Sequence, residues 1–187
     1  MIDESTCIEN DLITTLVSPV KNKCKVEKKT DNEGAWVIYA TRKNDKKRLA
    51  YEVGHSSDIY SELNRNIDLM FKKGKREQRG YFSDEIAYEW LDKTDFKYRT
   101  LISEYEDISI YKINITQFLN YESKKGSLSK IEFGCVKNNV LAEILFAYES
   151  NAICWNPGPK EKNEYSRFIE DEKAIAYKLK QLSDNRM

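Results

Sequence analysis

Apolar side chains recur at helical spacing in several parts of the chain. The clearest pattern begins after Ser57 or Asp58 and ends near Gly74, with apolar residues at i, i+4, i+8 and i+11 between charged flanks. This spacing is typical of an amphipathic helix packed on a core. The residues of this stripe are Ile59, Leu63, Ile67 and Met70. The same reasoning predicts further helices over residues 8–17, 36–40 (capped by Asn32), 83–90, 138–148 and 171–187.

Other stretches alternate or are rich in β-branched and aromatic residues, which favours strands. These stretches cover residues 20–30, 48–53, 96–102, 108–115, 130–135 and 152–155. Apolar parity switches between Ile110 and Ile113, which predicts a β-bulge there. Interspersed strands and helices indicate an α+β fold. We expect a single domain over 1–187, with a mixed or antiparallel sheet flanked by helices and a C-terminal helix over 171–187.

The charge balance excludes the strongly charged classes of protein. The 187 residues include 31 Lys and Arg against 31 Asp and Glu, so the formal net charge is zero. A histone-like binder would be strongly basic and a DNA mimic strongly acidic. The charged fraction is high, but aromatic residues make up 12% of the chain. Disordered segments lack that aromatic content, so the sequence predicts a folded globular protein.

Neither export nor membrane insertion is expected. The first residues, Met1–Ser5, are acidic and lack the basic and apolar regions of a signal peptide. The most apolar stretch, 140–148, contains Glu143 and is far shorter than the ~20 residues that cross a bilayer. We therefore expect a cytoplasmic protein without a membrane partner. Its cysteines are expected to be reduced thiols. They are Cys7, Cys24, Cys135 and Cys154.

Few residues offer catalytic or metal-binding chemistry. His55 is the only histidine, which excludes sites built on a pair of histidines, and no metal is expected. It follows a predicted strand, a position that suits either a surface residue or a catalytic one. No glycine-rich phosphate loop and no G-x-S-x-G motif is present.

A basic connection follows the predicted helix that ends near Gly74. Basic side chains with adjacent aromatic rings suit single-stranded nucleic acid, because phosphates pair with the cations and bases stack on the rings. A solvated loop is the alternative interpretation of the same residues. The candidate contact residues for nucleic acid or a protein partner are Lys72, Lys73, Lys75, Arg76, Tyr81 and Phe82.

Three segments, in order, resemble motifs of a large and mostly uncharacterised bacterial and phage family grouped with ADP-ribosyltransferase-like folds. Residues 36–40 (WVIYA) resemble the family's W-x-x-Y-A helix. Residues 95–102 (DFKYRTLI) are similar to its E-x-E-Y-R strand, and residues 129–135 (SKIEFGC) to its I-x-x-I-x-F-G-C strand. A weaker match places residues 24–27 (CKVE) at its C-F-S-E strand. The resemblance covers about residues 20–170.

The resemblance implies transfer of ADP-ribose from NAD to a macromolecule, in a phage–bacterium conflict or a toxin–antitoxin system. It makes Asp95 the remaining catalytic acid and Tyr39 and Arg99 the candidates for contact with NAD. Lys97 occupies the position of the second acid, whose negative charge would stabilise the positive transition state. Val26 replaces a serine expected to bond a ribose hydroxyl. These departures imply a degraded catalytic site.

Two other functions remain open. A non-enzymatic binding protein (an inhibitor, immunity or anti-defence factor) would act by occluding a protein partner, with Tyr81 and Phe82 as aromatic anchors. The third possibility is single-stranded nucleic-acid binding through residues 72–79. Because the second acid is absent, the sequence favours a binding protein over an NAD-dependent enzyme.

Overall fold

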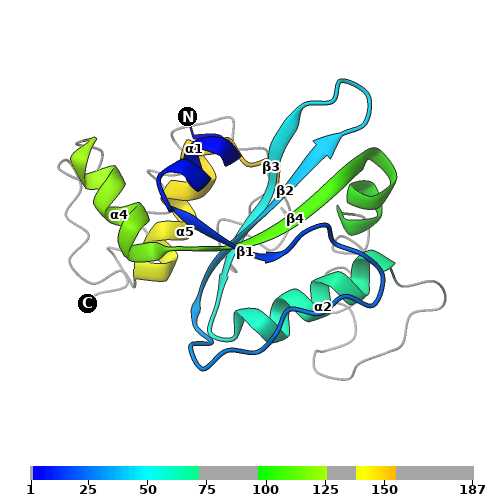
Figure 1. The fold of residues 1–187 in the computed structure, drawn as a ribbon, viewed down its shortest axis with the longest axis horizontal. Helices are drawn as coiled ribbons and strands as arrows, with labels where there is room; N and C mark the ends of the chain where they lie inside the picture. Colours follow the sequence, from blue (N-terminus) through cyan, green and yellow to red (C-terminus); the bar gives the residue numbers. More distant parts are fainter. Residues whose placement is uncertain (1, 72–96, 126–137, 155–187) are drawn as a thin grey trace, which may run out of the picture.

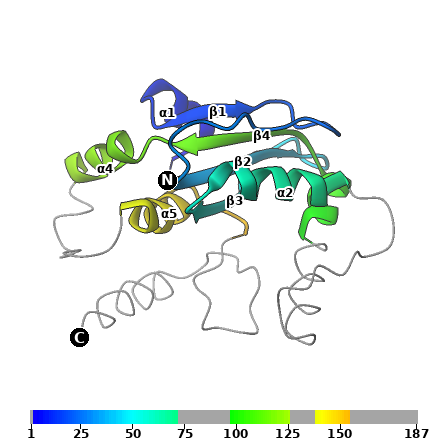
Figure 2. The ribbon, with the colours of Figure 1, turned by 90° about the horizontal axis from the view of Figure 1, so that it is seen from below.

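The computed structural model describes residues 2–71, 97–125 and 138–154. In these residues a four-stranded sheet forms the centre of the fold, with every pair of neighbouring strands antiparallel. Figure 2 shows the strands in their spatial order, with β1 and β3 at the edges. That order is β1 (Ile13–Val17), β4 (Tyr105–Ile113), β2 (Gly34–Arg42) and β3 (Arg48–Ser56). The α+β class and the antiparallel sheet flanked by helices are confirmed.

Helices cover both faces of the sheet (Figure 1). One face carries α1 (Glu4–Glu9), α4 (Ile115–Lys124) and α5 (Asn138–Glu149). The other face carries α2 (Ile59–Phe71) and a helical segment at residues 97–104. The sheet therefore separates two apolar cores.

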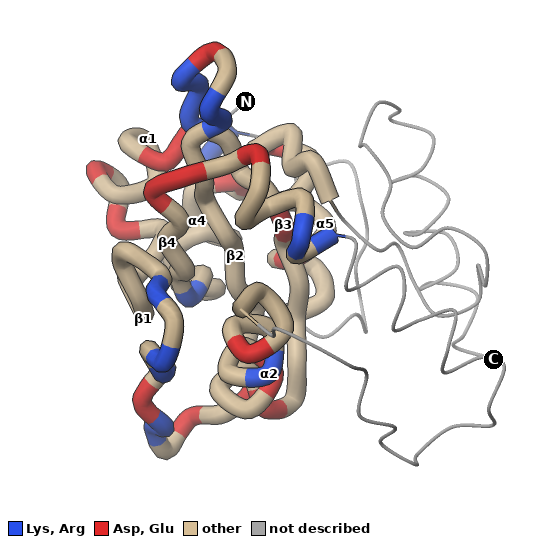
Figure 3. The backbone as a smooth tube through the Cα atoms, turned by 90° about the vertical axis from the view of Figure 1, so that its right-hand side faces the viewer, with Lys and Arg blue, Asp and Glu red and all other residues tan. Residues whose placement is uncertain are grey.

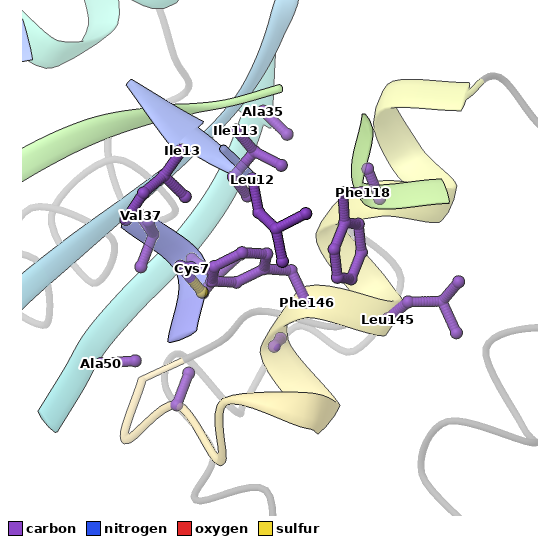
Figure 4. Packing of buried hydrophobic residues seen from close by; sticks show 14 of the residues in the cluster. Cys7, Leu12, Ile13, Ala35, Val37, Ala50, Ile113, Phe118, Leu145 and Phe146 are labelled. Carbon is purple, nitrogen blue, oxygen red and sulfur yellow. The ribbon is translucent and has the colours of Figure 1, made fainter. Parts of the chain in front are cut away.

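The first core lies beneath α1, α4 and α5. Cys7 of α1 and Phe118 of α4 meet Phe146 of α5 over the apolar side chains of the strands, as Figure 4 shows. The rings of Phe118 and Phe146 lie 5.1 Å apart between centroids. Burial of these side chains contributes most of the stabilisation that holds this layer on the sheet.

β2 is buried on both faces because successive side chains of a strand point in opposite directions. Ala35, Val37 and Tyr39 enter the first core. Trp36, Ile38 and Ala40 enter the second core, beneath α2 and the 97–104 segment. A strand covered on both faces has no polar alternation, so its sequence is a continuous apolar run.

This double burial explains one incorrect prediction. Residues 36–40 were expected to form a helix, but they form the middle of β2. The expected strand at residues 96–102 is also wrong, because residues 97–104 are helical and pack through Tyr98 and Leu101. Tertiary packing at this i, i+3 pair overrides the β propensity of the segment. At both positions the structure differs from the element that the family resemblance implies.

Two further predictions near the N-terminus are wrong. The expected helix at 8–17 divides, because α1 ends at Glu9 and β1 begins at Ile13. Residues 20–30 form an irregular loop instead of a strand. This loop runs beside α2, where Val26 exchanges two hydrogen bonds with the Asn64 amide, N to Oδ1 at 2.8 Å and Nδ2 to O at 3.1 Å. The carbonyl of Asn32 accepts from Ile59 N at the start of α2 (2.8 Å).

Several predicted elements are confirmed, including α2, β3, most of β4 and α5. The predicted bulge is displaced: on β4 the register with β2 shifts between Glu106 and Ser109, where Asp107 has a φ of 50°. Helix α4 was not predicted. The elements expected at 83–90, 130–135 and 171–187 lie outside the described residues.

The two edges of the sheet differ. Residues 153 and 154 of the predicted strand 152–155 bond to the outer edge of β3, with Ile153 N to Ala50 O at 3.0 Å and Cys154 N to Tyr51 O at 2.7 Å. At the other edge, β1 has an irregular register at Leu16 and ends just before Ser18 and Pro19.

Candidate functional site

Tyr39, predicted to contact NAD, lies inside the first core. Its side chain is 2% exposed, and its hydroxyl lies 3.7 Å from Cys7 Sγ. Its ring meets Tyr111 edge to face, with centroids 5.9 Å apart. Burial raises the pKa of the Tyr39 hydroxyl far above its ordinary value and raises the pKa of the Cys7 thiol to about 11. These contacts give Tyr39 a packing role.

Arg99, the other predicted NAD contact, lies on the opposite side of the sheet. It is an exposed residue of the 97–104 helix, which packs on the second core through Tyr98 and Leu101. Since Tyr39 faces the first core, the sheet stands between the two side chains. The structure does not bring these two predicted cofactor contacts together.

The remaining predicted site residues lie outside the described part of the chain. They are the candidate catalytic acid Asp95 and the candidate partner contacts Lys72, Lys73, Lys75, Arg76, Tyr81 and Phe82.

Lys97, which stands where the family pattern has an acid, forms an ion pair with Glu52 Oε1. The Lys97 and Glu52 side chains are only 12% and 10% exposed. The main-chain carbonyl of Lys97 accepts a hydrogen bond from the Tyr51 hydroxyl at 2.7 Å. Two adjacent residues of β3 thus bind the first turn of the 97–104 helix, one through charge and one through a neutral hydrogen bond.

A bulge in β3 explains how adjacent residues reach the same helix. Ile38 of β2 pairs with Glu52, but the next residue, Tyr39, pairs with Ala50, so Tyr51 is an extra residue in the ladder. Such an insertion interrupts strict alternation and re-aims a side chain. Tyr51 and Glu52 consequently both face the second core.

Other polar groups surround this ion pair. Burial raises the pKa of the Tyr98 hydroxyl well above its ordinary value, and the nearby Glu52 carboxylate acts in the same direction. Burial also raises the pKa of Glu62 on α2, with Glu52 again adding to the shift. Glu52 Oε2 is buried, and it has no hydrogen-bond partner among the residues that the structure describes. Glu52, Glu62, Lys97 and Tyr98 thus form a cluster of interacting polar groups between β3, α2 and the 97–104 helix.

The sequence analysis missed Glu52. The only feature of the sequence that pointed to Glu52 was its place as a single acid within the apolar strand predicted at 48–53. Its partner is 45 positions away along the chain. A local pattern does not reveal a pair that is formed by tertiary packing.

His55 pairs with a buried acid on the other face of β3. Its Nδ1 lies 2.5 Å from Glu143 Oε2 on α5. The His55 side chain is 35% exposed, whereas that of Glu143 is 5% exposed. The contact ties an edge strand to α5, because a buried carboxylate requires hydrogen bonds or a counter-charge. It gives the sole histidine a structural role that the sequence left open.

Replacement of His55 by alanine is expected to lower the free energy of unfolding by about 1–3 kcal/mol, because the Glu143 carboxylate loses this partner. Urea denaturation measures the loss. Glu143→Gln is the control, since it keeps the shape and removes the charge, and its loss should be smaller. A His55→Ala variant as stable as the wild type would show that the contact contributes nothing.

No group of three His, Cys, Asp or Glu side chains suited to a metal ion occurs among residues 2–71, 97–125 and 138–154. Within the same ranges, no helix has both the length and the apolar character needed to cross a lipid bilayer. Comparison with protein-family models, curated proteins and solved structures finds no match to this chain.

Proposed function

We propose that this chain is a non-enzymatic binding protein that acts by occluding a protein partner. The observation that carries the proposal is the buried ion pair between Lys97 and Glu52. Lys97 stands at the position where an ADP-ribosyltransferase-like site needs an acid, and its charge is neutralised inside the fold. A group committed to a structural pair contributes to packing of the 97–104 helix and not to stabilisation of a ribose cation.

The positions of Tyr39 and Arg99 support the same proposal. An NAD molecule held by both residues would have to contact opposite faces of a sheet that is covered on each side. The Tyr39 hydroxyl also lies against Cys7 within the first core. An inhibitor, an immunity protein or an anti-defence factor is the kind of protein that this proposal describes, as the sequence resemblance suggests.

NAD at millimolar concentration is expected to leave the melting temperature of the full chain unchanged within about 1 °C. A ligand present at a hundred times its Kd stabilises a protein by about 2.7 kcal/mol. For a chain of this size, each kcal/mol raises the melting temperature by roughly 2–4 °C. A thermal-shift series with NAD therefore distinguishes binding from no binding with a wide margin.

ATP at the same concentration controls for general effects of phosphate groups. If NAD raises the melting temperature by several degrees and ATP does not, the proposal is overturned and the ADP-ribosyltransferase hypothesis is favoured again. The corresponding positive result is a stoichiometric complex with a host or phage protein that reforms from the two purified chains. A chain that forms no such complex would also contradict the proposal.

A further inference from the structure

Within the described residues, lysines without an acidic partner are concentrated on the loop between β1 and β2. We call its lysines the lysine strip: Lys21, Lys23, Lys25, Lys28 and Lys29. All are exposed, and Figure 3 shows blue stretches on the loop that follows β1. Glu27 is the only acid between Lys21 and Lys29. The stretch is therefore strongly basic although the whole chain is neutral.

The lysine strip differs from most other cations of residues 2–71, 97–125 and 138–154. Cations elsewhere pair with acids: Arg42 with Asp45, Lys46 with Glu106, Arg48 with Glu4, Lys97 with Glu52, Lys112 with Asp31, and Lys125 with Glu122. No ion pair joins a strip lysine to a described acid. Lys28 interacts with Asp58 at longer range, where its positive charge helps to lower the pKa of the Asp58 carboxyl. Like charges without partners repel one another, which is a cost that an acidic ligand would remove.

The loop is held in place despite this repulsion. Val26 is 4% exposed in the second core, and its backbone exchanges two hydrogen bonds with the Asn64 side chain. Val20 is also buried, and its N–H bonds to Ile108 O at 2.8 Å. The lysine strip is therefore a surface with a defined position beside α2. A fixed set of charges loses less conformational entropy on binding than a loose tail does.

We infer that the lysine strip is a docking surface for an acidic segment of a partner protein, an inference that rests on the proposed function. Complementary charge guides the association of proteins and sets their orientation. Acidic side chains of this chain lie among the strip lysines. A protein partner can match such a mixed surface, because its own side chains can alternate between negative and positive charge. Asp58, just before α2, interacts electrostatically with Lys28, and Glu27 lies within the strip.

Nucleic acid fits this surface less well. Single-stranded nucleic acid is usually held by aromatic rings that stack on its bases as well as by cations that pair with its phosphates. Residues 18–33 contain no aromatic side chain on which a base could stack.

The inference is tested with the full chain and a fluorescein-labelled polyglutamate peptide, in a fluorescence anisotropy titration. The wild type should bind the peptide at ~50 mM salt and lose affinity by ~200 mM, as expected for exposed charges. Replacing all lysines of the strip with glutamine should weaken binding by about tenfold or more, since each exposed pair contributes a small amount. These side chains are exposed, so the melting temperature should not fall.

Two control variants replace basic residues outside the lysine strip. Lys47→Gln with Lys124→Gln removes exposed lysines elsewhere, and affinity should stay within about twofold. Replacing Lys72, Lys73, Lys75 and Arg76 with alanine tests the basic connection, and it should leave peptide binding intact. Unchanged affinity in the glutamine variant of the strip would overturn the inference. Loss of peptide binding in the 72–76 variant alone would also overturn it.

An oligothymidylate of equal charge tests the other class of partner. If it binds the strip more tightly than polyglutamate does, the occupant is nucleic acid and the inference fails. The partner complex of the proposed function provides a separate test. If that complex forms equally well with the strip variant, docking occurs elsewhere while the proposed function stands. If no complex forms with the wild type, the proposed function itself fails.

Discussion

Replacement of Lys97 by methionine is expected to lower the free energy of unfolding by about 3–5 kcal/mol. Methionine retains the length of the side chain but leaves the Glu52 carboxylate, which is 10% exposed, without its counter-charge. Removal of one partner of a buried pair leaves an uncompensated charge in a medium of low polarity. Urea denaturation followed by circular dichroism measures the change.

The double variant Lys97→Met with Glu52→Leu separates loss of the charge pair from loss of packing. With both charges removed, most of the lost stability should return, because an apolar pair of similar volume often replaces a buried ion pair without cost. A double variant as unstable as Lys97→Met alone would show that packing, and not charge, explains the loss. A stable single variant would remove the main support for the proposed function.

Replacement of Gly54 by alanine is the second large effect that we expect, a loss of about 1–3 kcal/mol or more. A Cβ atom at Gly54 would lie 2.5 Å from Cζ2 and 2.8 Å from Cε2 of the Trp36 ring on the neighbouring strand. Trp36 is 1% exposed in the second core, so a shift of the ring would disturb the side chains packed around it. Either the ring or the backbone of β3 must shift.

Gly34 provides a matched control in the same pair of strands. The nearest atom to a Cβ at Gly34 is Lys112 Cε at 3.3 Å, near the end of a flexible side chain. Gly34→Ala should therefore change stability by less than about 0.5 kcal/mol. Combining Gly54→Ala with Trp36→Phe should recover part of the loss, because a smaller ring relieves the contact. Equal losses at the two glycines would mean that contact with the Trp36 ring is not the cause.

Elements with one polar face could be predicted from the sequence. The apolar stripe of α2 lies between charged flanks because only one side of this helix meets the second core. Residues 36–40 lacked such a contrast, because β2 is buried on both faces. For the 97–104 helix, aromatic and β-branched residues suggested a strand, and only its contacts through Tyr98 and Leu101 stabilise the helix.

The candidate site was less predictable for a related reason. The departure at Lys97 was visible in the sequence, but its partner Glu52 was not, since the two residues meet only when the 97–104 helix packs on β3. The bulge that turns Glu52 toward Lys97 arises from an extra residue in the pairing of β3 with β2. Register shifts of this kind depend on both strands together, so neither strand alone reveals them.

The different edges of the sheet have a consequence for self-association. Unpaired strand edges are templates on which copies of a chain add to one another and form fibrils. Along the outer edge of β3, the carbonyls of Ala50 and Tyr51 already accept hydrogen bonds from Ile153 and Cys154. Along β1, only a short stretch precedes the irregularity at Leu16, and Pro19 has no N–H to donate. We therefore expect both described edges to limit the growth of a continuous intermolecular sheet, and so to disfavour amyloid-like aggregation.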